Sequence, residues 1–322
     1  MLNTEEEVRH QFNRFFIRAK MQSTYKPYFL KSLLDLTEYE NSTNSFHGKN
    51  WIKKLPDGLK VDLEFIASRF AFMYWNPHFK FRLKQSPAYP RKDVHIYLIL
   101  DYLQNKLEKR KKIPKITTFC SPNNSDIRKR IISKCIQADV LHRLLKDCNI
   151  YKISDDKKSI FVPYSVIEFI SKNKPLLQNA IDFVITSFLE TCNSAPQIAT
   201  KISEKEPISQ LKSSIFNQMK RKQKGLCFYC EKRKINVQEH VIPKNYVWET
   251  KPHNIVGACT KCNREKWYNL LPDEETFKKV LDRNDEEWLK KFEGDQYSRE
   301  VYELQYTTCH QDYADNEFWT PD

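Results

Sequence analysis

Hydrophobic positions in the first two thirds of the chain recur every three or four residues, which is the period of an amphipathic helix. In the first such segment the apolar side chains that share one helical face are Val8, Phe12, Phe15, Phe16 and Ala19. The segment 126–148 is preceded by a proline, two asparagines and a serine at residues 122–125, which are typical of the residues that cap the start of a helix. The pattern predicts helices at residues 5–20, 28–36, 62–75, 94–109, 126–148 and 164–192, the last with Pro175 inside it.

Two short apolar runs, IYKI at 150–153 and SIFV at 159–162, flank a polar stretch and predict a β-hairpin. A long helix followed by a hairpin can be a winged-helix element, which is the less favoured interpretation here. Residues 193–206 contain serine and proline and predict a linker between domains.

Composition narrows the classes of protein that fit. The 322 residues are enough for two domains. Only 5 glycines are present, and their positions form neither a dinucleotide-binding fingerprint nor a phosphate loop. The longest apolar runs fall far short of the roughly 20 residues that cross a bilayer, so we expect no membrane contact. The first ten residues, MLNTEEEVRH, lack the apolar region of a secretory signal, so the expected compartment is the cytoplasm.

Charge is distributed unevenly along the chain. The 54 basic and 41 acidic residues give a net charge of +13. Between Lys212 and Leu270 there are 13 basic and 4 acidic residues, whereas the following segment to Asp322 has 6 basic and 15 acidic ones. A basic segment is what binding to a phosphate backbone requires. The alternative is that lysines merely solvate helices, and for the first 211 residues both interpretations stay open.

Four of the nine cysteines form two C-x-x-C pairs within this basic segment. Pairs at this spacing can each hold one tetrahedral ion from a tight turn, and four thiolates favour zinc with no open coordination position. The sequence therefore predicts a structural Zn²⁺ site formed by Cys227, Cys230, Cys259 and Cys262.

The residues between the two cysteine pairs carry a second pattern. Apolar and polar residues alternate from Ile235 to Val241, which predicts a short strand ended by Pro243. Residues 254–258 predict a returning strand, and residues 262–270 a short helix. On the first strand Glu239 and His240 are adjacent, so they place a carboxylate and an imidazole on opposite faces.

This order, with its motifs, resembles the HNH (ββα-metal) endonuclease family. His240, Asn254 and Asn263 match the three motif positions, which corresponds to an H-N-N variant. The motifs C-x-Y-C-E, E-H-x-x-P-K and C-x-x-C-N-x-x-K resemble those of four-cysteine HNH nucleases of bacterial restriction and anti-phage defence systems. The resemblance covers residues 225–271.

The resemblance and the chemistry of phosphodiester hydrolysis together imply a role for each residue. His240 would be the general base, and Asn254 would hold it in place. Glu239 and Asn263 would bind a catalytic Mg²⁺ or Mn²⁺. Lys244 and Lys266 would contact phosphate. Two departures from many family members are Glu239 in place of aspartate and Asn263 in place of histidine, and the second predicts weaker use of Ni²⁺ or Zn²⁺ at the catalytic site.

The sequence thus predicts a mainly α N-terminal domain at residues 1–206 for recognition or partner binding. A small α+β HNH module, treble-clef-like, is expected at 207–285 and an acidic helix and tail at 286–322. The predicted function is a metal-dependent endonuclease acting on DNA, with a second protein of a defence system as a possible partner. The alternatives are a non-catalytic zinc-dependent nucleic-acid-binding module and an RNase effector. The oligomeric state stays open.

The acidic C-terminal segment has two interpretations. Its aromatic end, with Tyr313, Phe318 and Trp319, could cover the basic nuclease face and compete with DNA. The simpler interpretation is a solvated helix followed by a frayed tail.

Overall fold

The computed structural model describes residues 4–37, 51–87, 94–108, 125–267, 270–293, 297–313 and 318–321. Two compact units make up the chain, Met1–Asn193 and Ser194–Asp322. Within the described ranges, every helix is too short or too polar to cross a membrane.

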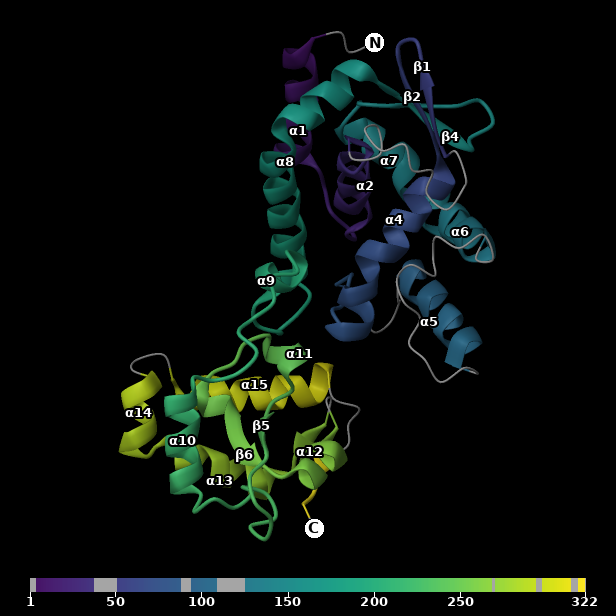
Figure 1. Cartoon of the computed structure of the whole chain (residues 1–322). Helices are drawn as coiled ribbons and strands as arrows, with labels where there is room; N and C mark the ends of the chain where they lie inside the picture. Colours follow the sequence, from purple (N-terminus) through teal and green to yellow (C-terminus); the bar gives the residue numbers. More distant parts are fainter. Residues whose placement is uncertain are drawn as a thin grey trace. The chain divides into compact units, whose positions relative to one another are not determined.

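The first unit is mainly helical, and each of the six predicted helices is present (Figure 1). Its helices are α1 (Glu5–Arg18), α2 (Tyr25–Leu34), α4 (Leu63–Trp75), η2 (Asn76–Lys80), α5 (His95–Glu108), α6 (Ser125–Ile131), η5 (Ile132–Val140), α7 (Leu141–Asp147) and α8 (Tyr164–Glu190). The predicted helix at 126–148 is a continuous helical run whose middle part, η5, has π geometry. The cap signal at 122–124 lies outside the described residues.

A four-stranded antiparallel sheet completes this unit. Its strands are β1 (Ile52–Leu55), β2 (Gly58–Asp62), β3 (Lys152–Ile153) and β4 (Ser159–Pro163), in the order β1-β2-β4-β3. The predicted hairpin is β3–β4, but it is half of a sheet rather than an isolated wing. The sequence analysis missed β1 and β2, although the turn signal Pro56-Asp57-Gly58 lies between them. A Cβ at Gly58 would clash with the carbonyl oxygen of Val162, so this close approach requires glycine.

The second unit contains the cysteine pairs. Its elements are α9 (Ile198–Ile202), α10 (Ser213–Lys222), β5 (Val237–His240), α11 (Lys244–Val247), η6 (Pro252–Asn254), β6 (Ile255–Ala258), α12 (Thr260–Lys266), β7 (Leu271–Pro272), α13 (Glu274–Asn284), α14 (Glu287–Glu293), α15 (Arg299–Asp312) and β8 (Phe318–Trp319). Strands β5 and β6 pair antiparallel, with Glu239 opposite Val256 and His240 opposite Ile255. The predicted order of strand, loop, strand and helix is therefore present.

Helix α12 is shorter than expected. It ends at Lys266 instead of continuing to Leu270. Trp267 follows with a φ of 55°, a left-handed value that a bulky residue rarely adopts and that stops the helix. Residues 268 and 269 lie outside the described residues.

The segment 194–206 is part of the second unit rather than a free linker, which moves the boundary from 206 to 193. The short helix α9 carries Lys201, whose side chain is only 1% exposed. Its ammonium group donates hydrogen bonds to the carbonyl oxygens of Pro196, at 2.7 Å, and of Tyr246, at 2.6 Å. The second bond ties this segment to α11.

The acidic C-terminal segment is likewise built into the core of the second unit, and the expectation of a frayed tail was wrong. The buried side chains of this segment that pack in the same cluster as the four paired cysteines are Tyr302, Tyr306, Cys309, Tyr313 and Trp319. Strand β8 pairs in parallel with β7. A segment that forms core cannot act as a detachable cover of the basic face, so this observation also argues against the masking hypothesis.

Candidate metal centre and the neighbouring polar site

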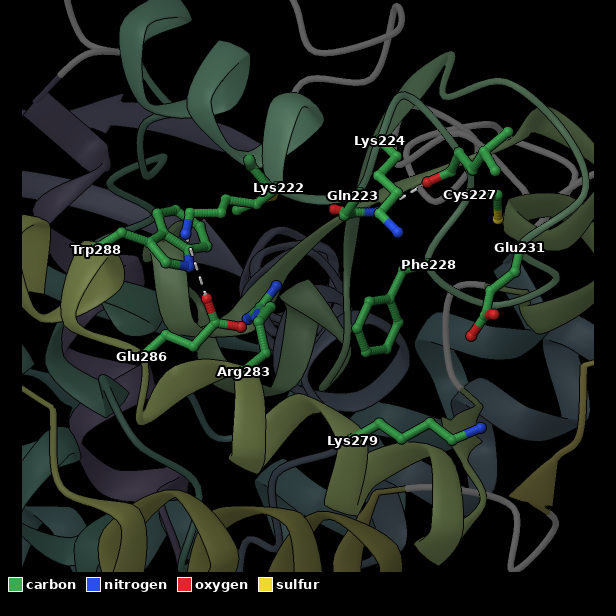
Figure 2. Close-up of a pocket in the computed structure, with 12 residues that line it drawn as sticks. Lys222, Gln223, Lys224, Cys227, Phe228, Glu231, Lys279, Arg283, Glu286 and Trp288 are labelled. Carbon is green, nitrogen blue, oxygen red and sulfur yellow. Dashed lines mark hydrogen bonds and ion pairs between the residues drawn. The ribbon is translucent and has the colours of Figure 1, made fainter.

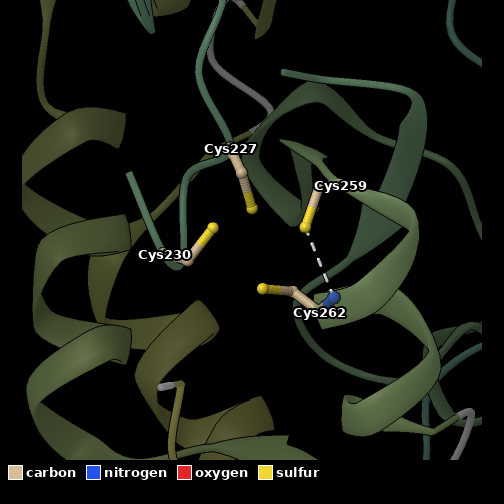
Figure 3. Close-up of side chains that lie close together, drawn as sticks. All are labelled: Cys227, Cys230, Cys259 and Cys262. Carbon is tan, nitrogen blue, oxygen red and sulfur yellow. Dashed lines mark hydrogen bonds between the residues drawn. The ribbon is translucent and has the colours of Figure 1, made fainter. Parts of the chain in front are cut away.

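The two C-x-x-C pairs come together as one cluster (Figure 3). The sulfur atoms of Cys227, Cys230, Cys259 and Cys262 all lie within 4.8 Å of one another, and the four residues are buried. A tetrahedral zinc ion with Zn–S bonds of about 2.3 Å places its ligand sulfurs about 3.8 Å apart. The cluster is close to that geometry, so these four cysteines can bind a metal ion such as zinc.

Local backbone geometry positions each pair. The N–H of Cys227 donates to the carbonyl of Arg233 at 2.7 Å, and the N–H of Glu231 donates to the carbonyl of Cys227 at 2.9 Å, so the first pair lies in a tight turn. Cys259 is the residue just before α12, and its sulfur accepts from the N–H of Cys262 at 3.4 Å (Figure 3). The second pair therefore sits at a helix start, where N–H groups favour a thiolate.

The thiols differ in acidity. Although burial opposes ionisation, hydrogen bonds from backbone N–H groups and from the neighbouring thiols lower the pKa of Cys230 to about 6. The pKa of Cys259 is lowered in the same way. Burial raises the pKa of Cys227 and of Cys262. Because the thiols of raised pKa must lose their protons to become ligands, metal binding at this cluster would release protons.

Glu239 and Lys266 form a buried ion pair between β5 and α12. The Lys266 ammonium lies 3.0 Å from Oε1 of Glu239 and also donates to the carbonyl oxygen of His240 at 2.8 Å. The Lys266 side chain is 1% exposed and the Glu239 side chain 13%. Burial raises the pKa of Glu239, and the attraction of Lys266 only partly offsets this effect.

This geometry corrects the role predicted for Lys266. A buried ammonium group that is already bound to a carboxylate and a carbonyl cannot serve as a surface contact for phosphate. Its role is to join the helix to the strand. The Lys266 ammonium binds Oε1, and a hydrogen bond from the His240 backbone also lowers the pKa of this carboxylate, so Oε2 is the oxygen that Lys266 leaves for a cation.

His240 lies at the end of β5 in a desolvated, positively charged environment. Burial, together with the charges of Lys244 and Lys266, lowers its pKa to about 3, and the Glu249 backbone carbonyl opposes this only in part. The imidazole is therefore neutral at physiological pH. Its Nε2 lies 3.3 Å from the Thr250 hydroxyl, which donates its own hydrogen to the carbonyl of Ile208 at 2.6 Å. The Thr250 oxygen is then an acceptor, an arrangement that favours a proton on Nε2.

Asn254 clamps the loop that follows His240. Its Oδ1 accepts from the N–H of Ile242 at 2.8 Å, and its Nδ2 donates to the carbonyl of Ile242 at 2.9 Å. Its own carbonyl accepts from the N–H of Val241 at 2.9 Å. The side chain is buried, and the Tyr302 hydroxyl donates to the same Oδ1 at 2.7 Å. The side-chain amide and the backbone carbonyl of Asn254 therefore fix the two residues directly after His240.

Asn263 and Lys244 lie at the edges of this arrangement. Asn263 is one helical turn before Lys266 on α12, so both are on the helix face that meets β5. It is half-buried, and its side chain forms no hydrogen bond with the described residues. Lys244 is the first residue of α11, half-buried, and close enough for its charge to lower the pKa of His240. Its contact with phosphate stays a prediction.

Sequence reasoning missed several residues that support the site. Tyr302 on α15 contacts Asn254 from 48 positions away. Arg283 on α13 donates from Nη2 to the carbonyl of His253 at 2.8 Å and from Nη1 to that of Ile255 at 2.5 Å, on either side of Asn254. No local pattern identifies such partners, because the contacts form only when distant helices pack on β6.

Comparisons of the chain with models of protein families, with curated proteins and with solved structures found no match.

Proposed function

We propose that this protein is a metal-dependent endonuclease of the HNH type that hydrolyses phosphodiester bonds, with DNA as its substrate. The observation that supports this most is the Asn254 clamp on Ile242, because it gives the middle motif residue the positioning role that hydrolysis by His240 needs. The strongly basic segment around the site provides attraction for a phosphate backbone. A role in bacterial restriction or anti-phage defence rests on the motif resemblance.

In this proposal His240 accepts the proton of the attacking water. The imidazole is already neutral, so no prior deprotonation is required. A pKa of about 3 makes it a weak base, and the approach of an anionic phosphate would raise that pKa by offsetting the charges of Lys244 and Lys266. Asn254 and Thr250 keep the ring oriented while the proton moves.

Glu239 and Asn263 would hold a divalent cation of the Mg²⁺ or Mn²⁺ type through Oε2 and the amide oxygen. Hard oxygen ligands suit these ions, and two protein ligands leave positions for water and phosphate. Such a cation stabilises the negative charge that develops on the phosphate and on the leaving 3′ oxygen. Lys266 would hold Glu239 in place from its other oxygen.

The test is cleavage of supercoiled plasmid by the full chain with Mg²⁺ or Mn²⁺. We expect nicking by the parent protein and by His142→Ala, which removes an exposed imidazole in the first unit. We expect none from His240→Ala, which keeps all four cysteines. Equal cleavage by His240→Ala and the parent, or cleavage that requires added Zn²⁺, would contradict the proposal.

One observation favours a second candidate, a nucleic-acid-binding module without hydrolysis. The Lys266 ammonium already neutralises Glu239, as a metal ion would. If this pair excludes divalent cations, the parent protein will bind DNA but leave plasmid and RNA substrates intact at any Mg²⁺ or Mn²⁺ concentration. Binding of Mn²⁺ by the parent, lost in Glu239→Gln, would favour the nuclease instead.

A further inference from the structure

A pocket of about 500 Å³ lies in the second unit, away from the residues proposed for hydrolysis (Figure 2). Its walls come from α10, the turn of the first cysteine pair, α13 and the start of α14. The volume is within the range of about 300–1000 Å³ that is usual for small-ligand sites. His240, Glu239, Asn254 and Asn263 do not line it.

The wall of the pocket includes a buried guanidinium group that forms no direct ion pair, although Glu286 on the same wall attracts it. Arg283 is 8% exposed, and its guanidinium group donates only to neutral acceptors: three backbone carbonyls at 2.5, 2.8 and 3.5 Å and the Asn284 amide oxygen at 2.6 Å. Among the described residues no carboxylate lies within ion-pair distance of it. A buried cation without a carboxylate partner costs free energy that an anion in the pocket would offset.

The rim adds further positive charge. Lys222, Lys224 and Lys279 are exposed lining residues, and the two lining carboxylates are Glu231 and Glu286. Glu286 forms an ion pair with Lys222, which Figure 2 marks with a dashed line. Their charged atoms lie 3.8 Å apart, so the two charges offset each other. Lys279 also lies 3.7 Å from Glu275, which does not line the pocket. With Arg283, four cations therefore face three nearby carboxylates, and the pocket keeps a net positive charge that attracts an anion.

The remaining wall is aromatic and apolar, which a site for inorganic phosphate alone would not need. Phe228 lines the pocket beside the guanidinium of Arg283, which lies 5.8 Å from the ring centroid. Trp288 lines it from α14, and its indole N–H is buried without an acceptor in the described part of the chain. A ligand with a planar ring could stack on the aromatic side chains and accept a hydrogen bond from the Trp288 N–H. A phosphate group on the same ligand would bind the cationic rim.

We propose that this pocket binds a nucleotide, with the base against Phe228 and Trp288 and the phosphate toward the lysines of the rim. Aromatic side chains bind bases of any sequence by stacking, and a cationic rim follows the backbone of a single strand. The nucleotide is either free or one unit of a strand. The inference goes beyond the proposed hydrolysis and does not require it.

The test is binding of a 5′-fluorescein-labelled eight-residue oligothymidylate to the full chain, measured by anisotropy without added divalent cation. Lys279→Gln removes a lining lysine, and Lys278→Gln is its matched control, an exposed neighbour on α13 that does not line the pocket. We expect Lys279→Gln to weaken binding about threefold or more and to reduce the salt slope by about 0.7, the value for one phosphate contact on a single strand. Lys278→Gln should change neither.

Trp288→Phe keeps a ring and removes the N–H, and it should weaken binding about 3- to 10-fold, as for a lost hydrogen bond. Competition identifies the source of the ligand. Displacement of the probe by thymidine monophosphate but not by inorganic phosphate supports a free nucleotide, and displacement only by unlabelled oligothymidylate supports a strand unit.

Three results would overturn the inference: no binding of the probe, equal affinity for Lys279→Gln and Lys278→Gln, or inorganic phosphate competing as well as the nucleotide. Because the assay measures binding without catalysis, a protein that binds the probe but cleaves no plasmid contradicts the proposed function alone.

Discussion

Removing the Lys266 ammonium should destabilise the second unit through Glu239. In Lys266→Met the methylene packing is largely kept, but a carboxylate that is 13% exposed loses its only ion-pair partner among the described residues. Breaking one side of a buried pair costs about 3–5 kcal/mol, and the partial exposure of Glu239 favours the lower end of this range. We therefore expect the free energy of unfolding at pH 7 to fall by about 3 kcal/mol, measured by urea denaturation.

The loss should depend on pH. Burial already raises the pKa of Glu239, and without Lys266 the pKa rises further. An acid whose folded-state pKa exceeds its unfolded value binds more protons in the folded state, so stability increases as pH falls through the folded pKa. Lys266→Met should therefore lose less stability relative to the parent at acidic pH than at pH 7.

The control is a pair of further variants. Glu239→Gln/Lys266→Met removes both charges and should regain most of the loss, because a neutral replacement of a buried pair is often tolerated. Lys261→Met removes an exposed lysine of the same helix and should change stability by less than about 0.5 kcal/mol. An equal loss in the double variant and in Lys266→Met alone, or a loss that is independent of pH, would refute the reasoning.

Four further predictions follow from particular contacts. The purified protein should contain one zinc per chain by elemental analysis, and Cys262→Ser should lose the metal and lower the melting temperature. Burial lowers the pKa of Lys201 to about 7, so above pH 7 the unfolded state binds more protons than the folded state. The free energy of unfolding should therefore rise from pH 7 to 10. Denaturation curves of Lys201→Met should show a smaller rise. Tyr302→Phe should cost about 1 kcal/mol by losing the bond to Asn254 and should slow plasmid cleavage without reducing zinc content. Truncation after Lys291 removes the buried side chains of α15, so we expect the second unit to unfold, as measured by loss of its circular dichroism signal. A truncated protein that folds and binds DNA more tightly would restore the masking hypothesis.

The sequence determined the local elements and the donors of the metal centre. The three-four periodicity identified helices such as α1, which buries Val8, Phe12 and Phe15 on a single face. The cysteine pairs were identified because two residues are the spacing at which a tight turn directs both sulfurs to one ion. The alternation from Ile235 to Val241 likewise placed His240 at a strand end.

Only the tertiary structure decided how these elements are held together. Lys266 and Glu239 are 27 positions apart, so their pairing depends on how α12 packs on β5. In the sequence, Lys266 is one basic residue among many in a basic segment, and we expected it to contact phosphate. Its burial in the folded protein shows that it instead joins the helix to the strand. The acidic charge of the last segment suggested a solvated tail. Its charged residues lie on the exposed face of the helix, and the charge count gives no information about the tyrosines on the buried face. That Arg283 is buried and donates to neutral acceptors is also invisible in the sequence, because burial and partners are properties of the packed chain.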